Sequence, residues 1–414
     1  ASVAGSGAPP NGLADATGFR AALAAARARL PQPLPPHRTV EAWTLDSIEA
    51  AQLLPSDQAL AFDLAHAEDA ARSAQSRAAA HLARARARLL AEPSRIPQAP
   101  ILAALAPALA GRLVPRLLRA GHPVILHAPD RASLTASLES VAEAQLAEVR
   151  AGQLSEDQAE ADWRNVTGRL IPEPAVGLGL ADREHARWLA EAAPHATPLV
   201  LWLEAGQARD MADLPQALLV IPAPTRPALL CEVVTPPETP PQAIADAMGL
   251  VRVLGHLPLR SRGTSALTAM IRTAARTAAR LRALGVAAET LARCPILPPG
   301  LAAGAAAVDL TPLPLPVERL ILLALVNQGA QLLAEGVARR PSDLDLAMVL
   351  GAGWPEWRGG PMAEADAIGP LVLRHESLTA QSLDPDLWSP APLLEDMLRH
   401  GWRFETLNRP GAPA

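Results

Sequence analysis

From about residue 98 onward, short apolar runs alternate with helical segments, and this alternation constrains the fold more than any other feature. The expected elements, in chain order, are an apolar run from 98, a helix over 110–121, the apolar run HPVILHAPD over 122–130, a long helix over 131–152, and strands over 198–203 and 217–222. Strands that alternate with helices form a mostly parallel, doubly wound sheet. We therefore expect an α/β domain in the middle of the chain.

Helical sequence surrounds this α/β region on both sides. Residues 13–94 have helical periodicity interrupted by proline-rich breaks such as PQPLPPH. The stretch EVVTPPETPP at 232–241 predicts a strand followed by a rigid turn. From about 264 the chain is nearly all helical, in two blocks separated by the Pro/Gly/Ala-rich stretch 295–316.

Composition excludes several classes of partner. The formal charge of -5 gives no reason to expect nucleic acid or an anionic membrane as partner. Arginines and prolines interrupt every long apolar run, so no membrane span is expected, and no signal peptide is visible. Two cysteines, Cys231 and Cys294, are too few for a disulfide framework and indicate a reducing, cytoplasmic compartment. The ten histidines form no H-x-x-x-H or H-E-x-x-H pair, so no metal site is predicted.

The stretch GAGWPEWRGGPM at 351–362 begins with Gly-x-Gly, as nucleotide-binding loops do. A loop of that kind follows a strand and opens a helix, whereas this one follows the helical segment DLDLAMVL and contains Pro355 and Pro361. We interpret it as a tight, glycine-dependent loop between packed helices, in which Trp354 and Trp357 bury apolar area. The alternative is a domain or subunit contact made by Trp357 and Arg358.

The segment that contains this loop, VERLILLALVNQGAQLLAEGVARRPSDLDLAMVLGAGWPEWRGGPMAEADAIG, resembles the C-terminal helical domain of 3-hydroxyacyl-CoA dehydrogenases. It is most similar to the multifunctional proteins of fatty-acid β-oxidation, and the similarity continues through DLWSPAPLLEDMLRHGWRF at 386–404. Weaker similarity extends back through AGHPVIL and LLCEVVTPPET. The resemblance implies a helical linker (1–95), a Rossmann-like degenerate NAD-binding domain (96–260), and two helical C-terminal repeats, the first shortened (261–310) and the second intact (311–414).

The residues that bind NAD in this family are replaced here. The three positions of the family's G-x-G-x-x-G fingerprint fall on Leu105, Pro107 and Ala110, and only the offset Gly111 is a glycine. Leucine and proline add bulk where a backbone must approach pyrophosphate, and proline also lacks an amide donor. The acidic residue that holds the ribose is replaced by Ala128, and the nearby Asp130 would serve only if the loop were rebuilt.

The catalytic dyad of the family is a histidine followed twelve residues later by a glutamate, which orients it for proton exchange. The glutamate position is Glu232, but the histidine position is Val220, which cannot carry a proton. The family's substrate-contacting asparagines fall on Ala223 and Leu267, and its serine-rich segment reads WLEAGQA at 202–208.

No replacement chemistry is evident in the sequence. Without its histidine, Glu232 is interpreted as a strand-end carboxylate paired with a nearby arginine. Cys231 is interpreted as a buried structural cysteine, with a reactive thiol as the alternative. His185 and His195 are expected at the surface.

We therefore expect a degenerate module that keeps the fold without the hydride chemistry, acting as a structural or regulatory partner. One alternative is an active NAD-dependent dehydrogenase that oxidises 3-hydroxyacyl-CoA to 3-oxoacyl-CoA; another is a fragment of a multifunctional hydratase/dehydrogenase. NAD is implied as a cofactor by the resemblance alone. The partners it implies are an acyl-CoA, an active β-oxidation enzyme or a second copy of this chain.

Overall fold

The computed structural model describes residues 15–31, 34, 39–95, 99–170, 177–192, 196–203, 217–224, 229–304 and 312–409. Contacts within the chain divide it into two compact units. The first comprises Ala1–His81 and Glu356–Gly359, and the second comprises Leu82–Pro355 and Gly360–Ala414. The domain boundaries that the resemblance implies, at 95, 260 and 310, remain predictions.

The first unit is helical, as the proline-interrupted periodicity of its sequence predicts. Its helices are α2 (Ala16–Ala28), α3 (Thr39–Leu53), α4 (Ser56–Arg72) and the start of α5 (Ala74–Leu90). Asp15 caps α2 by accepting from the backbone N–H of Thr17. The guanidinium of Arg27 then joins α2 to α3 through Asp46 and Glu49, at 2.6 and 2.7 Å.

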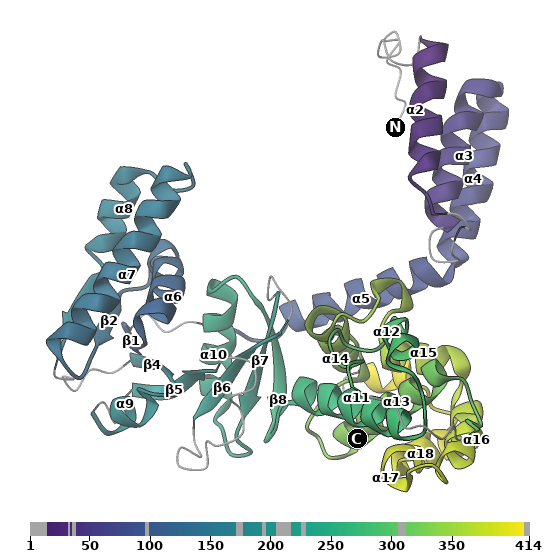
Figure 1. Cartoon of the computed structure of the whole chain (residues 1–414). Helices are drawn as coiled ribbons and strands as arrows, with labels where there is room; N and C mark the ends of the chain where they lie inside the picture. Colours follow the sequence, from purple (N-terminus) through teal and green to yellow (C-terminus); the bar gives the residue numbers. More distant parts are fainter. Residues whose placement is uncertain are drawn as a thin grey trace. The chain divides into compact units, whose positions relative to one another are not determined.

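The second unit contains one eight-stranded sheet in the order β3-β2-β1-β4-β5-β6-β7-β8 (Figure 1). The strands are β1 (Ile101–Ala104), β2 (Val124–His127), β3 (Val166–Arg169), β4 (Gly177–Asp182), β5 (Ala196–Trp202), β6 (Leu218–Pro222), β7 (Leu230–Thr235) and β8 (Leu257–Arg262). Neighbouring strands are parallel except β6 and β7, which form an antiparallel pair. The predicted doubly wound parallel sheet is therefore confirmed.

Helices cover both faces of this sheet. The helices of this region are α6 (Pro107–Arg119), α7 (Arg131–Arg150), α8 (Glu156–Trp163), α9 (Ala186–Ala192) and α10 (Pro241–Val253). Side chains of α6, α7 and α10 share one apolar core with β1, β2 and their neighbours, whereas α9 packs on the opposite face with Leu102 and Ala104. Figure 1 shows α6 and α7 on one side of the sheet and α9 on the other.

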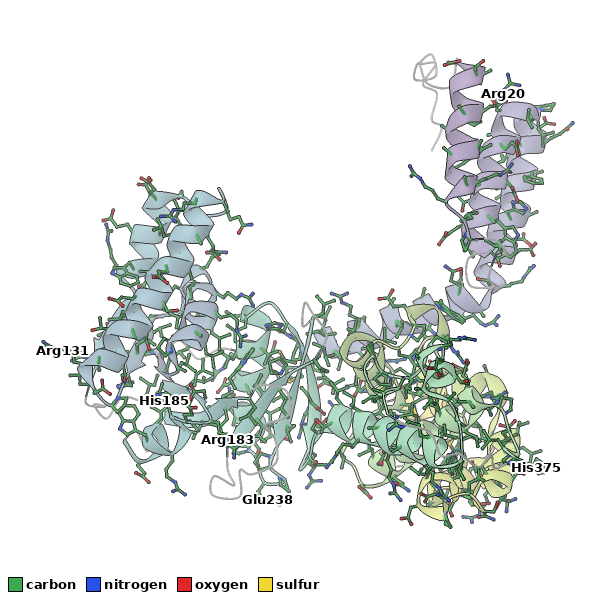
Figure 2. The ribbon with its side chains drawn as sticks, viewed as in Figure 1. Arg20, Arg131, Arg183, His185, Glu238 and His375 are labelled. Atoms are coloured by element: carbon green, nitrogen blue, oxygen red, sulfur yellow. The ribbon has the colours of Figure 1, made fainter. Side chains whose placement is uncertain are left out.

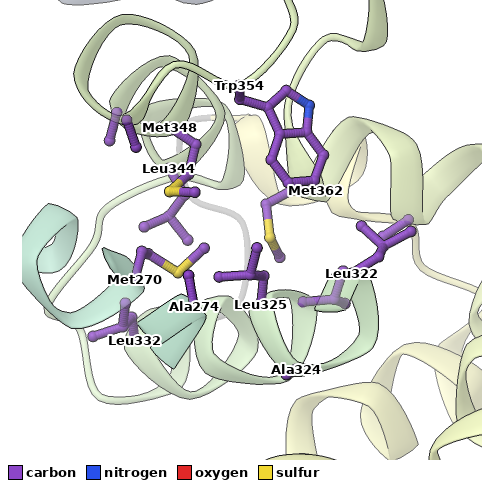
Figure 3. Close-up of a cluster of buried hydrophobic side chains, with 14 of the residues drawn as sticks. Met270, Ala274, Leu322, Ala324, Leu325, Leu332, Leu344, Met348, Trp354 and Met362 are labelled. Atoms are coloured by element: carbon purple, nitrogen blue, oxygen red, sulfur yellow. The ribbon is translucent and has the colours of Figure 1, made fainter. Parts of the chain in front are cut away.

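A helical region follows the sheet and has the largest apolar core of the molecule. Its helices are α11 (Ala266–Ala283), α12 (Ala288–Ala292), α13 (Val317–Ala334), α14 (Pro341–Leu346), α15 (Pro361–Ile368), α16 (Pro370–Ala380), α17 (Pro385–Trp388) and α18 (Pro392–His400), with a π-helical turn at Ala347–Gly351 and 3-10 turns at Glu356–Arg358 and Phe404–Asn408. Figure 3 shows Met270 of α11, Leu325 of α13 and Met362 of α15 meeting in this core. The predicted Rossmann-like domain followed by a helical domain is thus the observed architecture.

Within the described part of the chain, α13 is the one helix long and apolar enough to cross a membrane, judged by length and composition. Of its 18 residues, 67% are buried inside the protein, as expected for the central helix of an apolar core. Its burial explains its composition without a membrane.

Candidate functional site

The carboxyl ends of β1 and β4 mark the point at which the sheet reverses direction. From β1 the chain winds outward through β2 and β3, and it then returns to β4 on the other side of β1. In open α/β sheets, ligands bind in the crevice outside such a topological switch point. A ligand site is therefore expected at this edge of the sheet.

The turn from β1 into α6 contains the three positions at which the family has glycines. Leu105 is buried, Pro107 is the first residue of α6, and Ala110 is fully buried on its inner face. Ala106 lies between the strand and the helix as N-cap, and its side chain makes no capping hydrogen bond. The backbone carbonyl of Leu105 accepts from the Ser137 hydroxyl at 3.3 Å.

The carboxylate of Asp182, the last residue of β4, reaches the beginning of α6. One oxygen accepts from the backbone N–H of Ala106 at 2.5 Å. The other accepts from the backbone N–H of His185 at 3.0 Å and lies 2.7 Å from Nδ1 of its ring. A carboxylate at a helix N-terminus is stabilised by the helix dipole and by N–H groups that the helix leaves unpaired.

Each partner in this pair shifts the pKa of the other. The hydrogen bond to Asp182 raises the pKa of His185, although burial opposes this. Burial favours a higher pKa for Asp182, but hydrogen bonds from His185 and Ala106 outweigh it and hold the pKa below its usual value. The prediction that His185 is a surface residue is wrong, because its side chain is only 20% exposed and pairs with Asp182 (Figure 2). Asp182 itself was missed because an Asp at a strand end, without a glycine motif, carries little sequence signal.

Three further candidates near this edge, Gly111, Ala128 and Asp130, have structural roles. Adding a Cβ at Gly111 would bring it within 2.8 Å of the Ser140 backbone oxygen, so this glycine permits α6 to approach α7 closely. Ala128 is buried just after β2. Asp130 caps α7 by accepting from the backbone N–H of Ser133 at 2.8 Å, and this hydrogen bond lowers the pKa of its carboxyl.

Glu232 lies on β7, and its fully buried carboxylate points at the start of α11. It accepts from the backbone N–H groups of Ala266 and Leu267, at 2.6 and 3.3 Å, and from the hydroxyls of Ser261 and Ser265. The predicted pairing with an arginine is therefore wrong: hydroxyl and backbone donors satisfy this carboxylate. Burial raises its pKa, although the four hydrogen bonds oppose the shift.

Val220 and Glu232 lie on opposite faces of the sheet. The β6–β7 ladder pairs Val220 with Val233 and Ile221 with Glu232, and paired residues share a face. Val220 accordingly packs in the core beside α6 and α10. Ile221, not Val220, therefore stands beside Glu232 on β6, and isoleucine carries no proton either.

The remaining polar positions of the family are apolar and buried here. Ala223 is 5% exposed, and its backbone N–H donates to the carbonyl of Leu230 at 2.9 Å. Leu267 is 3% exposed, and its side chain packs against Gly351. His195 and residues 204–208 of the WLEAGQA segment lie outside the described residues.

Cys231 is fully buried, and burial raises the pKa of its thiol to about 12. The thiol is therefore protonated near neutral pH, which agrees with a structural cysteine and disfavours a reactive one. Among the residues that the structure describes, no group of three or more His, Cys, Asp or Glu side chains could hold a metal ion.

The loop GAGWPEWRGGPM connects packed helices, as expected. Trp354 is buried, and its backbone N–H donates to the carbonyl of Met348 at 3.0 Å. Gly360 has φ +106°, and a Cβ there would collide with Asp345, whose carboxylate accepts from the backbone N–H of Met362 at 2.7 Å. The glycine therefore lets a carboxylate cap α15. Trp357 is half-buried, with the guanidinium of Arg358 5.5 Å from its ring centre.

Three known proteins show what this chain is similar to. It is 38% identical over 85 residues to the fatty acid oxidation complex subunit alpha of Idiomarina loihiensis, and 34% identical over 85 residues to a peroxisomal fatty acid beta-oxidation multifunctional protein of Arabidopsis thaliana. Each match covers 20% of this chain and 12% of the relative. The solved 3-hydroxybutyryl-CoA dehydrogenase of Escherichia coli has a TM-score of 0.54 and 14% identity, covering 73% of this chain and 99% of that one.

No family model matches the chain. The agreement in fold extends over almost the whole E. coli dehydrogenase. The clear agreement in sequence, by contrast, covers only a short segment of the multifunctional proteins. Both comparisons confirm the predicted resemblance: this chain has the fold of the 3-hydroxyacyl-CoA dehydrogenases and resembles in sequence the multifunctional proteins of fatty acid β-oxidation.

Proposed function

We propose that this chain is a 3-hydroxyacyl-CoA dehydrogenase-like module that neither binds a nicotinamide dinucleotide nor transfers hydride, and that it acts as a structural or regulatory partner in fatty acid β-oxidation. The main support is the carboxylate of Asp182 at the start of α6. Dinucleotide-binding sheets keep this helix terminus open so that backbone N–H groups meet the pyrophosphate. Here a pyrophosphate would meet the negative charge of Asp182 and a proline without an N–H.

The environment of Glu232 supports the loss of hydride chemistry. In a catalytic dyad, the carboxylate must be free to orient a histidine and to stabilise its charge. The Glu232 carboxylate is instead held by four donors, the Ser261 hydroxyl on β8 and three groups at the start of α11, and none of these donors is a histidine. Its role in this fold is to anchor a helix to the sheet.

The proposed partner is an active β-oxidation enzyme or a second copy of this chain. An acyl-CoA is the one small ligand of the family whose binding needs no redox chemistry. We propose the cytoplasm as its compartment. The support for that compartment is that both cysteines, Cys231 and Cys294, are free and buried.

Thermal unfolding of the full chain with NADH, and separately with acetoacetyl-CoA, tests the proposal. A ligand at about 100 times its dissociation constant stabilises the native state by roughly 2.7 kcal/mol, which raises Tm by a few degrees. We expect no change in Tm with NADH, and no NADH formation from 3-hydroxybutyryl-CoA and NAD. An authentic dehydrogenase measured alongside serves as the positive control for both assays.

A rise in Tm with NADH, or NADH formation from 3-hydroxybutyryl-CoA and NAD, would contradict the proposal. A rise with acetoacetyl-CoA alone would identify a binding module that lacks the redox half of the reaction. If neither ligand shifts Tm, the module is a scaffold, and co-purification with an active β-oxidation enzyme becomes the next measurement.

A further inference from the structure

Arginines lie opposite each other where the edge strand β8 pairs with a segment of the helical region. Ser261 of the edge strand β8 forms an antiparallel bridge with Ala338, and the backbone N–H of Arg262 donates to the carbonyl of Val337 at 3.0 Å. Continuing this register by one residue places Arg260 opposite Arg339. Like charges directly opposite each other in an antiparallel pair are destabilising.

The side chains of Arg260 and Arg262 lie on the same face of β8. Successive residues of a strand alternate between its faces, and Ser261 between them points to the other face, where its hydroxyl donates to Glu232. Arg260 is half-buried, whereas Arg262 is exposed and the side chain of Arg339 is 56% exposed. Burial, together with the neighbouring charges of Arg339 and Arg262, lowers the pKa of Arg260, and the charge of Glu92 opposes this shift only in part.

The nearest acidic side chain cannot neutralise this group. Glu92 is 9% exposed, and one of its carboxylate oxygens already accepts from both Arg339, at 2.7 Å, and Arg340. In the part of the chain that the structure describes, no carboxylate lies within ion-pair distance of Arg260 or Arg262. Among the described residues, neither guanidinium group therefore has an ion-pair partner, and the charge of Glu92 offsets only part of the repulsion on Arg260.

The surroundings add further positive charge. Arg252 bonds only to neutral oxygens: the Ser94 hydroxyl and the carbonyls of Leu89 and Glu92. Among the described residues, six arginines and three acids interact here through ion pairs, hydrogen bonds or their neighbouring charges, namely Arg88, Arg252, Arg260, Arg262, Arg339 and Arg340 with Glu92, Asp343 and Glu405. Burial raises the pKa of Asp343 to about 6, so the positive excess grows further in mild acid. Cationic side chains thus gather at this edge although the chain as a whole has a net charge of -5.

We propose that Arg260, Arg262 and Arg339 form a binding site for a dianionic phosphate group. Guanidinium groups present paired N–H donors that match phosphate oxygens, and a dianion offers enough charge to relieve the repulsion between three cations. The free phosphate ion and a phosphate monoester of a nucleotide share this chemistry. The site lies on the edge strand β8 rather than at the β1–α6 turn, so it is independent of the proposed loss of dinucleotide binding.

Thermal unfolding at constant ionic strength tests this site in the full chain. Tm is measured at about pH 8, where phosphate is mostly dianionic, in chloride, in inorganic phosphate, in AMP and in adenosine. We expect phosphate and AMP to raise Tm relative to chloride, and adenosine to leave it unchanged. A larger rise with AMP than with phosphate assigns the site to a nucleotide monoester, and equal rises assign it to the free ion.

Two substitutions and a matched control give the test its specificity. Arg260→Gln removes a guanidinium without breaking an ion pair, and we expect it to weaken phosphate binding by at least about tenfold, the factor that one charge-assisted contact represents. Arg339→Gln should do the same, although it also loses the contact with Glu92. Arg272→Gln, at an exposed position of α11 outside the network, should bind as the wild type does.

Arg260→Gln has a second expected signature. In chloride, the Tm of this variant should equal or exceed that of the wild type, because the substitution removes a repulsion. In phosphate, the wild type should have the higher Tm. An unchanged Tm of the wild type in phosphate and AMP overturns the proposal. So does a phosphate shift that persists undiminished in Arg260→Gln.

Discussion

The buried carboxyl of Glu232 predicts that the stability of the fold depends on pH. Because the pKa of its carboxyl in the folded chain is raised above the ordinary value of 4.5, charging it costs the fold stability. Its contribution is greatest below about pH 4.5 and declines as the pH rises through the raised pKa. We expect the difference in unfolding free energy between wild type and Glu232→Gln to shift in favour of the Gln variant over that interval.

Urea unfolding of both proteins across this pH range measures the difference, and Glu232→Ala is the companion variant. Alanine would leave the buried N–H groups of Ala266 and Leu267 without an acceptor, which costs roughly 1–3 kcal/mol for each unsatisfied group. If Glu232→Gln and wild type change in parallel with pH, Glu232 titrates normally and the argument from burial is wrong.

The Asp182–His185 pair predicts a change of the same sign in a higher pH range. The pKa of His185 is raised above 6.5, so its stabilising contribution is fully present below about that pH and is lost as the pH rises through the raised value. On the acid side it fades as Asp182 is protonated, below the ordinary value of 3.8. His185→Leu should therefore lose more stability at about pH 5.5 than at about pH 8.5, by roughly 1–2 kcal/mol for a charged hydrogen bond.

His375 is exposed on α16, so His375→Leu is the matched control for this measurement (Figure 2). It should show no such difference between the two pH values. An equal loss at both pH values in His185→Leu would mean that the ring acts by packing alone.

At the scale of elements, the contact between α6 and α7 depends on Gly111. Alanine favours helices over glycine by about 1 kcal/mol, but a Cβ here would press on the Ser140 backbone oxygen. We expect Gly111→Ala to lower the unfolding free energy by about 1–3 kcal/mol, as overpacked cores do. Adding Ser140→Ala should restore little, because the backbone contact remains; full recovery in the double variant would assign the clash to the hydroxyl.

Three strands escaped sequence analysis for reasons of composition. β4 has the sequence GLGLAD, in which glycines weaken the strand signal although every residue is buried. β3, with the sequence VTGR, is mostly exposed, and β8 contains a proline. Strand preference depends on cross-strand neighbours rather than on the residues alone, so these segments become strands only beside partners already in place.

At the scale of the whole molecule, architecture was predictable and side-chain pairing was not. Periodic apolar runs and the long segment around GAGWPEWRGGPM specified a doubly wound sheet and a helical domain. The donors of Glu232, by contrast, come from residues 29–35 positions further along the chain, and the bond from Ala106 to Asp182 spans 76. Contacts of that length are set by the tertiary fold, and a residue's local sequence does not specify them.

The short bridge between β8 and Val337–Ala338 also bears on aggregation. An unpaired edge strand is a template on which other chains can add strands and aggregate. Here a segment from the helical region covers part of that edge, and the charges of Arg260 and Arg262 discourage further pairing. A chain cut before α13 would lose this cover, and we expect it to aggregate more readily than the full chain.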